Sequence, residues 1–183
     1  MTARNHLPAD AIAAMAETSY THPLNANAIR HTRTLGDLAG VFADTEAWRK
    51  MDISSPVYRV QALLPVPEGT PGGVYWGTTV IEPGKVGREY FMTRGHFHAL
   101  TDRTEIYIGV AGEGALLLMD EERRTSLQPM TRGSIHHIRG GLAHRVANTG
   151  TSPLSFLAAW PSDAGHDYES IERSGFSARL VEV

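Results

Sequence analysis

The chain has 183 residues, of which 42% are hydrophobic, so it is long enough to bury one core and fits the size of a single domain. The formal charge of −3 comes from 17 basic and 20 acidic residues spread along the chain, which argues against a surface for nucleic acid or an anionic membrane. Cysteine is absent, which excludes disulfides, thiolate metal ligands and a cysteine nucleophile.

The N-terminal extension, residues 1–55, is expected to contain two helices, Pro8–Glu17 and Leu35–Lys50. Its first residues lack the apolar core of a signal peptide, and no apolar run of the chain approaches the roughly 20 residues that cross a membrane. We therefore expect a cytoplasmic protein whose partner is a small molecule or a second copy of itself.

Residues 56–161 have an all-β pattern, in which short runs of β-branched and aromatic residues are separated by glycine and proline. So many short strands suit a closed or sandwiched barrel, which leaves no long exposed edge. A C-terminal segment, residues 162–183, contains a helical turn at Tyr168–Arg173, and the whole chain is predicted to be one domain. The expected strands are Val57–Leu64, Val74–Ile81, Glu89–His98, Glu105–Val110, Ala115–Met119, Thr125–Gln128, Ser134–Ile138, His144–Asn148 and Leu154–Trp160.

Four residues of this β region form a candidate metal site. On a strand, His96 and His98 project from the same face, because Phe97 between them points to the other side. A hairpin brings Glu105 back beside them, and a jelly roll folds the later strand with His144 next to the pair. Three imidazoles and one carboxylate suit ferrous iron first, with manganese, zinc or nickel as alternatives.

The spacing of these ligands resembles the two sequence motifs of the cupins. The first motif runs from His96 to Gly112, with Tyr90 in place of its usual opening glycine. The second motif runs from Gly133 to Asn148, with Arg139 in place of its usual proline. The resemblance implies a cupin double-stranded β-helix, which is a jelly-roll barrel, with short helical segments at both ends.

A closer resemblance, over about Val74–Ser177, is to the cupin-type phosphoglucose isomerases of archaea and some bacteria. It depends on two phrases, TRGHFH at residues 93–98 and PSDAGHDY at residues 161–168. The resemblance implies a metal-dependent aldose–ketose isomerase that interconverts glucose 6-phosphate and fructose 6-phosphate through an enediol or enediolate. It also implies a homodimer that pairs its barrels through an N-terminal strand.

Isomerisation requires a base beside the two carbons between which a proton moves. Glu105 is the best candidate from its position, because a carboxylate at the metal can accept a proton, although a hydride shift stays open. Tyr107 shares the strand face of Glu105 and is expected to hydrogen-bond a sugar hydroxyl. By resemblance, His166 and Tyr168 close over the sugar and assist ring opening.

The phosphate must be held by other donors, because neither of the two lysines lies near these motifs. By resemblance the clamp consists of the Thr79 and Thr93 hydroxyls and the Gly95 N–H. Trp160 stands where the family has a phosphate-binding tyrosine, and Arg139 is expected to compensate because a guanidinium suits phosphate oxygens.

Three other functions stay open at this point. One is a related sugar-phosphate isomerase or epimerase, which the changes at Arg139–Leu142 and Trp160 allow. A second is a metal-dependent sugar-binding cupin without catalysis, which would need the histidines but not Thr79, Thr93 or Tyr107. A third is a cupin dioxygenase, which would need an apolar pocket and no phosphate clamp.

Overall fold

A computed structural model describes residues 28–182 of the chain. The predicted helix Pro8–Glu17 lies outside the described residues. The remaining elements are mostly short strands, as expected. They are β1 (Ile29–Thr34), the 3-10 helix η1 (Gly36–Leu38), α2 (Thr45–Arg49), β2 (Pro56–Leu63), β3 (Val74–Ile81), β4 (Lys85–Val86), β5 (Glu89–Tyr90), β6 (Glu105–Ala111), β7 (Gly114–Met119), β8 (Thr125–Met130), β9 (Ile135–Ile138), β10 (Ala143–Asn148), β11 (Leu154–Pro161) and α3 (Glu169–Ser174).

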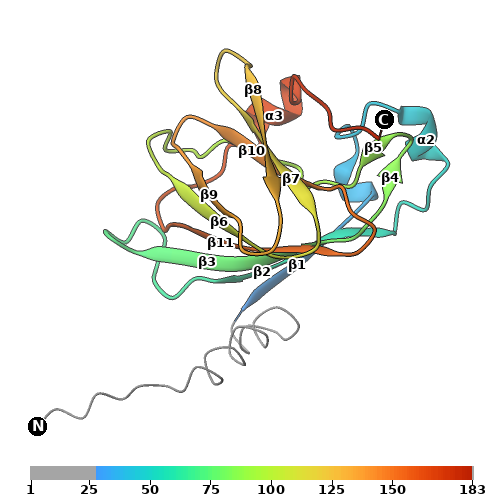
Figure 1. Ribbon diagram of the computed structural model, residues 1–183. Coiled ribbons are helices and arrows are strands. Elements are labelled where there is room, and N and C mark those ends of the chain that lie inside the picture. The colour runs from blue at the N-terminus through green and yellow to red at the C-terminus, as the bar shows by residue number, and fades with distance from the viewer. Residues whose placement is uncertain (1–27, 183) are drawn as a thin grey trace, which may run out of the picture.

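Two antiparallel sheets form the barrel (Figure 1). The larger sheet has six strands in the order β1-β2-β3-β11-β6-β9, and the smaller has three in the order β10-β7-β8. In Figure 1 the smaller sheet lies over the larger one, and α3 lies beside it. Strands that are distant in sequence, such as β3 and β11, are therefore neighbours. This arrangement confirms the predicted all-β cupin barrel.

The main hydrophobic core lies between the two sheets. Ile81 of β3 and Phe156 of β11 contribute to it from the large sheet, and Leu116 of β7 and Val146 of β10 contribute from the small one. Along each strand of the large sheet, alternate side chains point toward this core or away from it. One end of the interior is lined by polar side chains instead, and that end contains the candidate site.

Asn148, the last residue of the second motif, is fully buried and ties three chain segments together. Its side-chain amide donates to the carbonyl oxygens of Ile81 and Ser152, both at 2.9 Å, and its Oδ1 accepts from the Gly150 N–H at 2.9 Å. Every polar atom of this side chain is thus paired, as a buried amide requires. The residue connects the end of β10 to β3 and to the turn before β11.

Most predicted strands agree with the observed ones to within two residues, but Glu89–His98 is wrong. Only Glu89 and Tyr90 belong to a strand, and isolated bridges follow at Met92, His96 and Phe97. Gly95, at a φ of +80°, turns the backbone out of the extended conformation between the bridges at Met92 and His96. Thr93–Gly95 therefore forms a loop at the mouth of the barrel.

Two further differences lie near the N-terminus of the described chain. Leu35–Lys50 was predicted as one helix, but Gly40, at φ +82°, separates η1 from α2. Asp44 then caps α2, because its Oδ1 accepts from the Ala47 N–H at 2.8 Å. Strand β1 was missed. Among residues 28–182 no helix is both long and apolar enough to cross a membrane.

Candidate metal centre and cavity

The structure brings the four predicted ligands together at one end of the barrel. Glu105 is the first residue of β6, and His144 is the second residue of β10. Glu105 Oε2 lies 3.3 Å from His98 Nε2 and 3.0 Å from His144 Nε2. One ligand atom from each of these residues and from His96 lies within 4.8 Å of all the others.

His96 reaches this cluster through a backbone bridge to β10, although it belongs to no ladder of strands. The His144 N–H donates to the His96 carbonyl at 3.0 Å, and the His96 N–H donates to the His144 carbonyl at 3.3 Å. The two residues are thus paired directly across the bridge, and their rings lie 4.4 Å apart. The paired hydrogen bonds fix the position of both imidazoles.

Two of the imidazoles are oriented by backbone carbonyls behind them. His98 Nδ1 lies 3.0 Å from the Arg103 carbonyl, and His144 Nδ1 lies 3.2 Å from the Leu142 carbonyl. A carbonyl can only accept, so each Nδ1 carries the proton and each Nε2 directs its lone pair into the cluster. Histidines that bind metals are commonly oriented in this way.

Arg103 is itself held in place by a fork of two hydrogen bonds to Asp163. Its Nε lies 2.9 Å from one carboxylate oxygen and its Nη2 lies 2.7 Å from the other. This hydrogen bonding lowers the pKa of Asp163. Asp163 belongs to the PSDAGHDY phrase, so that phrase supports the orientation of His98 from a distance.

The donor set fits a divalent metal ion. His96 Nε2 and His144 Nε2 are buried and have no hydrogen-bond partner in the described chain, because the short approach of His144 to Glu105 lacks hydrogen-bond geometry. Buried polar atoms are rarely left unpaired. Three imidazole nitrogens and one carboxylate oxygen, with carbonyls behind two of the rings, suit iron, manganese, zinc or nickel.

Glu105 carries a negative charge at neutral pH. Burial opposes its ionisation, but the neighbouring His144 and His98 outweigh this effect and lower its pKa. Burial, together with the neighbouring histidines, holds the pKa of His96 well below its usual value, so that imidazole is neutral. Burial also raises the pKa of Tyr107 well above its usual value, and the phenol stays protonated.

A cavity of about 370 Å³ opens from this cluster between the sheets. It is large enough for a six-carbon sugar phosphate. His98 does not line this cavity, since it lies behind the other ligands. The predicted substrate residues that do line it are Thr79, Thr93, Gly95, Tyr107, Trp160, His166 and Tyr168.

His166 and Tyr168 lie at the rim of the cavity, both exposed to solvent. Their rings are stacked, with centroids 5.6 Å apart and planes inclined by 6°. The His166 ring lies 4.5 Å from that of His96. The GHDY phrase thus places two hydrogen-bonding side chains directly beside the metal cluster, where a bound sugar would meet them.

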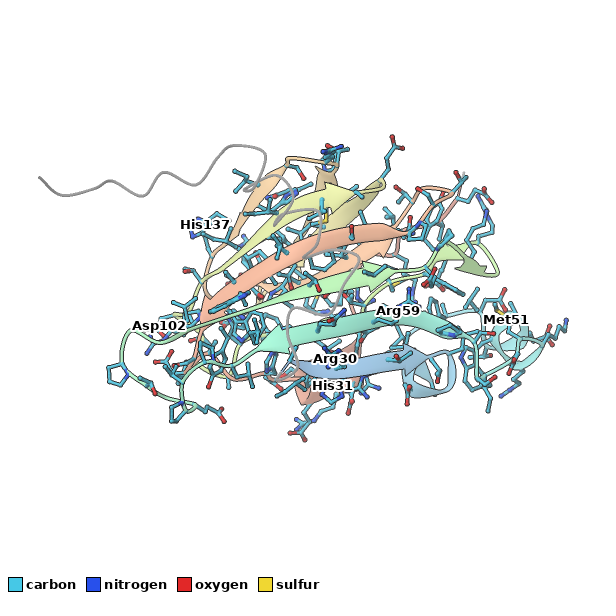
Figure 2. All side chains as sticks on the ribbon, turned by 90° about the horizontal axis from the view of Figure 1, so that it is seen from below. Arg30, His31, Met51, Arg59, Asp102 and His137 are labelled. Atoms are coloured by element: carbon cyan, nitrogen blue, oxygen red, sulfur yellow. The ribbon has the colours of Figure 1, made fainter. Side chains whose placement is uncertain are left out.

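Arg139, which the sequence suggested as a phosphate ligand, does not line this cavity. Arg139 is exposed in the turn after β9 and lines a separate hollow with Arg124 and His137. The Gly140–Gly141 turn that follows keeps Arg139 on the outside, because Gly140 packs against the backbone of residues 101 and 102. Figure 2 shows Asp102 and His137 on the same side of the barrel.

Polar residues that sequence reasoning missed also line the cavity, among them His31, Arg33, Tyr58 and Arg94. His31 and Arg33 belong to β1, whose largely polar sequence gives no strand alternation to detect. Figure 2 labels His31 on this strand. Tyr58 lies beside Arg33 in the sheet register. Arg94 stands within the TRGHFH phrase and would have been the easiest to find, but its guanidinium is bound to Glu172 at 2.5 Å.

Comparison with known proteins identifies relatives over most of the chain. A family model described as glucose-6-phosphate isomerase matches residues 32–183. The glucose-6-phosphate isomerase of Thermococcus kodakarensis is 46% identical over 151 residues, which are 82% of this chain and 79% of that protein. The glucose-6-phosphate isomerase of Pyrococcus furiosus is 41% identical over 155 residues, which are 84% of this chain and 81% of that protein.

An oxalate decarboxylase from Bacillus subtilis superimposes on 64% of this chain with a TM-score of 0.47 and 18% sequence identity. The matched part is 29% of the decarboxylase chain, so this chain spans less than a third of that protein.

We predict that one divalent ion binds per chain and stabilises the fold. With the ion at about a hundred times its Kd, mass action adds about 2.7 kcal/mol, or a Tm rise of roughly 5–10 °C for a chain of this size. Metal analysis and thermal unfolding with manganese measure both effects. His98→Ala should abolish them, whereas His137→Ala, at an exposed position, should not. Equal metal content in wild type and His98→Ala would contradict the assignment.

Proposed function

Because the chain belongs to the glucose-6-phosphate isomerase family, we propose that its cavity interconverts glucose 6-phosphate and fructose 6-phosphate through an enediolate. The observation that carries this proposal is the convergence of His96, His98, Glu105 and His144 at the end of a cavity of about 370 Å³. A divalent ion held there would polarise the carbonyl and stabilise negative charge on the neighbouring oxygens.

Glu105 is the proposed base. It is 5% exposed, it is ionised at neutral pH, and its carboxylate borders the cavity. A proton taken from C2 of glucose 6-phosphate is returned to C1, so one carboxylate serves both carbons as acceptor and then as donor. Tyr107 lies two residues further along the same strand face and offers a protonated hydroxyl to a sugar oxygen.

Thr79, Thr93 and Gly95 are the proposed phosphate ligands. Thr93 Oγ1 accepts from the Val146 N–H at 3.1 Å, which fixes the hydroxyl and leaves its hydrogen free to donate. Thr79 is buried on β3 and pairs with Phe156 of β11. Phe156 in turn pairs with Gly109 of β6, which is four residues after Glu105 on that strand. The phosphate would therefore lie between Thr79 on β3 and the Thr93–Gly95 loop, which line the same cavity.

Arg33 adds a positive charge to this end of the cavity. It lies in register with Tyr58 on the inward face of β1, and its guanidinium forms no ion pair or hydrogen bond within the described chain. A free guanidinium beside a cavity suits a phosphate dianion. We assign to Arg33 the electrostatic role that the sequence had suggested for Arg139.

His166 is the proposed residue for ring opening, with Tyr168 stacked against it. Both side chains lie at the rim beside His96, where the sugar ring enters, and an imidazole can transfer protons at neutral pH. Trp160 lines the same cavity and pairs with Tyr75 on β3. Its indole supplies a flat apolar wall for the sugar.

The proposed activity is tested by a coupled assay for glucose 6-phosphate formed from fructose 6-phosphate. Activity should disappear after chelation and return with ferrous iron or manganese. Because the ligands also lie inside the barrel, loss of the ion should lower the Tm in the same samples. Full turnover in protein shown to contain no metal would contradict metal-dependent isomerisation.

A second prediction addresses the phosphate ligands. Thr79→Val and Thr93→Val keep the β-branched shape but remove a donor each, so each should raise the KM for fructose 6-phosphate by about tenfold, the scale of one hydrogen bond to a charged group. Metal content should not change. Arg139→Ala is the control and should leave the KM as in wild type. Normal KM values in both threonine variants would remove these residues from the site.

We also propose that the protein is a homodimer that buries the outer face of the large sheet. This face carries apolar side chains that are more than a third exposed on neighbouring strands, namely Trp76, Ile106, Ile108 and Ile135. Across the sheet, Trp76, Ala159 and Ile106 are paired in one row. The adjacent row pairs Leu157 with Ile108 and Ile108 with Ile135. A contiguous apolar surface of this kind is typical of an interface.

The dimer is tested by light scattering. Ile108→Asp places a charge in the middle of this face and should halve the molecular mass from twice 20.0 kDa to the mass of one chain. Leu127→Asp introduces the same charge at an exposed apolar position on β8 and should leave the mass unchanged. A wild-type protein with the mass of one chain would contradict the proposal.

A further inference from the structure

Arg145 is a buried cation that the reaction as described above does not use. It directly follows His144 on β10, so its side chain points away from the metal cluster. It is 5% exposed, its guanidinium carbon lies 4.1 Å from the centroid of the Phe176 ring, and Nη1 lies 3.4 Å from Met92 Sδ. These neighbours are apolar or only weakly polar.

This guanidinium has no ion pair within residues 28–182. The buried carboxylate in this region, Glu89, is bound instead to Arg179 at 2.7 Å and to the Ala43 N–H at 2.7 Å. Burial lowers the pKa of Arg145 to about 10, which still leaves it positively charged at neutral pH. Keeping an unpaired charge inside a protein is costly, so a hydrophobic side chain would be the more stable choice here.

The polar contact that Arg145 does make is to the loop at the mouth of the barrel. Its Nη2 donates a hydrogen bond to the carbonyl oxygen of Arg94. That oxygen belongs to the same planar peptide group as the N–H of Gly95. A charged donor on the oxygen draws electron density from the nitrogen and fixes the plane of the peptide, which makes the Gly95 N–H a stronger donor.

The polarised Gly95 N–H is available to donate a hydrogen bond to a ligand. Gly95 lines the cavity, and its N–H donates no hydrogen bond to any residue in the described part of the chain. The backbone here is also held tightly, because a Cβ on Gly95 would lie 2.7 Å from the Phe176 ring and 3.0 Å from Arg145 Cβ. The peptide is thus pressed against the side chain that polarises it.

We propose that Arg145 is a positioning residue for the substrate's phosphate, which acts through the Arg94–Gly95 peptide to bind a phosphate oxygen. This inference rests on the proposed function, because it requires the phosphate to lie at Gly95. It explains why a charged side chain is kept in an apolar environment. It also provides part of the positive potential at a phosphate site that has no lysine.

The test compares Arg145→Met with Arg145→Lys in the metal-loaded enzyme. Methionine keeps the apolar packing and removes the charge, so the KM for fructose 6-phosphate and the Ki of inorganic phosphate as a competitive inhibitor should both rise by about tenfold. Lysine should restore part of the loss. Metal content and kcat should stay close to wild type, whereas a merely structural role would lower metal content, kcat and Tm together.

Arg132→Met, which removes an exposed arginine from the turn between β8 and β9, is the matched control and should change neither constant. If Thr93→Val weakens the binding of inorganic phosphate but Arg145→Met leaves the phosphate Ki unchanged, the role of Arg145 is overturned. If Thr93→Val has no effect either, the proposed phosphate site is wrong. In the zinc-loaded wild-type enzyme, the Gly95 amide proton should move downfield when phosphate is added, and an unmoved signal would also overturn the inference.

Discussion

The pair of backbone hydrogen bonds between His96 and His144 is the constraint on which the site depends. It fastens the Thr93–His98 segment to β10, and so it brings the first sequence motif against the second. Further backbone hydrogen bonds hold the same segment, from the Thr93 N–H to the Val146 carbonyl and in both directions between Phe97 and Asp167. The His96–His144 pair is the contact among these that joins two metal-site residues directly.

The same contact links the metal centre to the proposed phosphate ligands. Thr93 and Gly95 precede His96 by one to three residues, and Arg145 follows His144 by one. Side chains on one side of the bridge meet the metal cluster, while Arg145 on the other side holds the Arg94 carbonyl. The two ends of the substrate would thus be bound by the same short piece of chain, which fixes the distance between them.

The sequence predicted the barrel and the four clustered residues well, because both depend on short patterns. Alternation in Val74–Ile81 gives a strand with the observed bounds, and the spacing of His96 and His98 puts both rings on one side whether or not a ladder forms there. The predictions failed where the position of a residue depends on segments that are far away in the sequence. Arg139 looked suited to phosphate, but only the folded chain shows that its turn lies outside the cavity.

Sequence patterns could not identify residues that act through their backbone atoms. Leu142 and Arg103 orient two imidazoles with their carbonyls, and any residue type supplies a carbonyl. Arg33 was missed for another reason, because β1 pairs along an edge of the sheet and its alternating residues are mostly polar and exposed. Its place beside the cavity follows from its register with Tyr58.

The central claim is that Glu105 is the base of a metal-dependent isomerase, and Glu105→Gln tests it most directly. Glutamine keeps a carbonyl oxygen near the three histidines but cannot accept a proton at neutral pH. The metal-loaded variant in deuterium oxide should lose about a hundredfold or more in kcat, with an equal loss of deuterium incorporation at C2 of the substrate. A variant with normal metal content that isomerises at the wild-type rate would contradict the account.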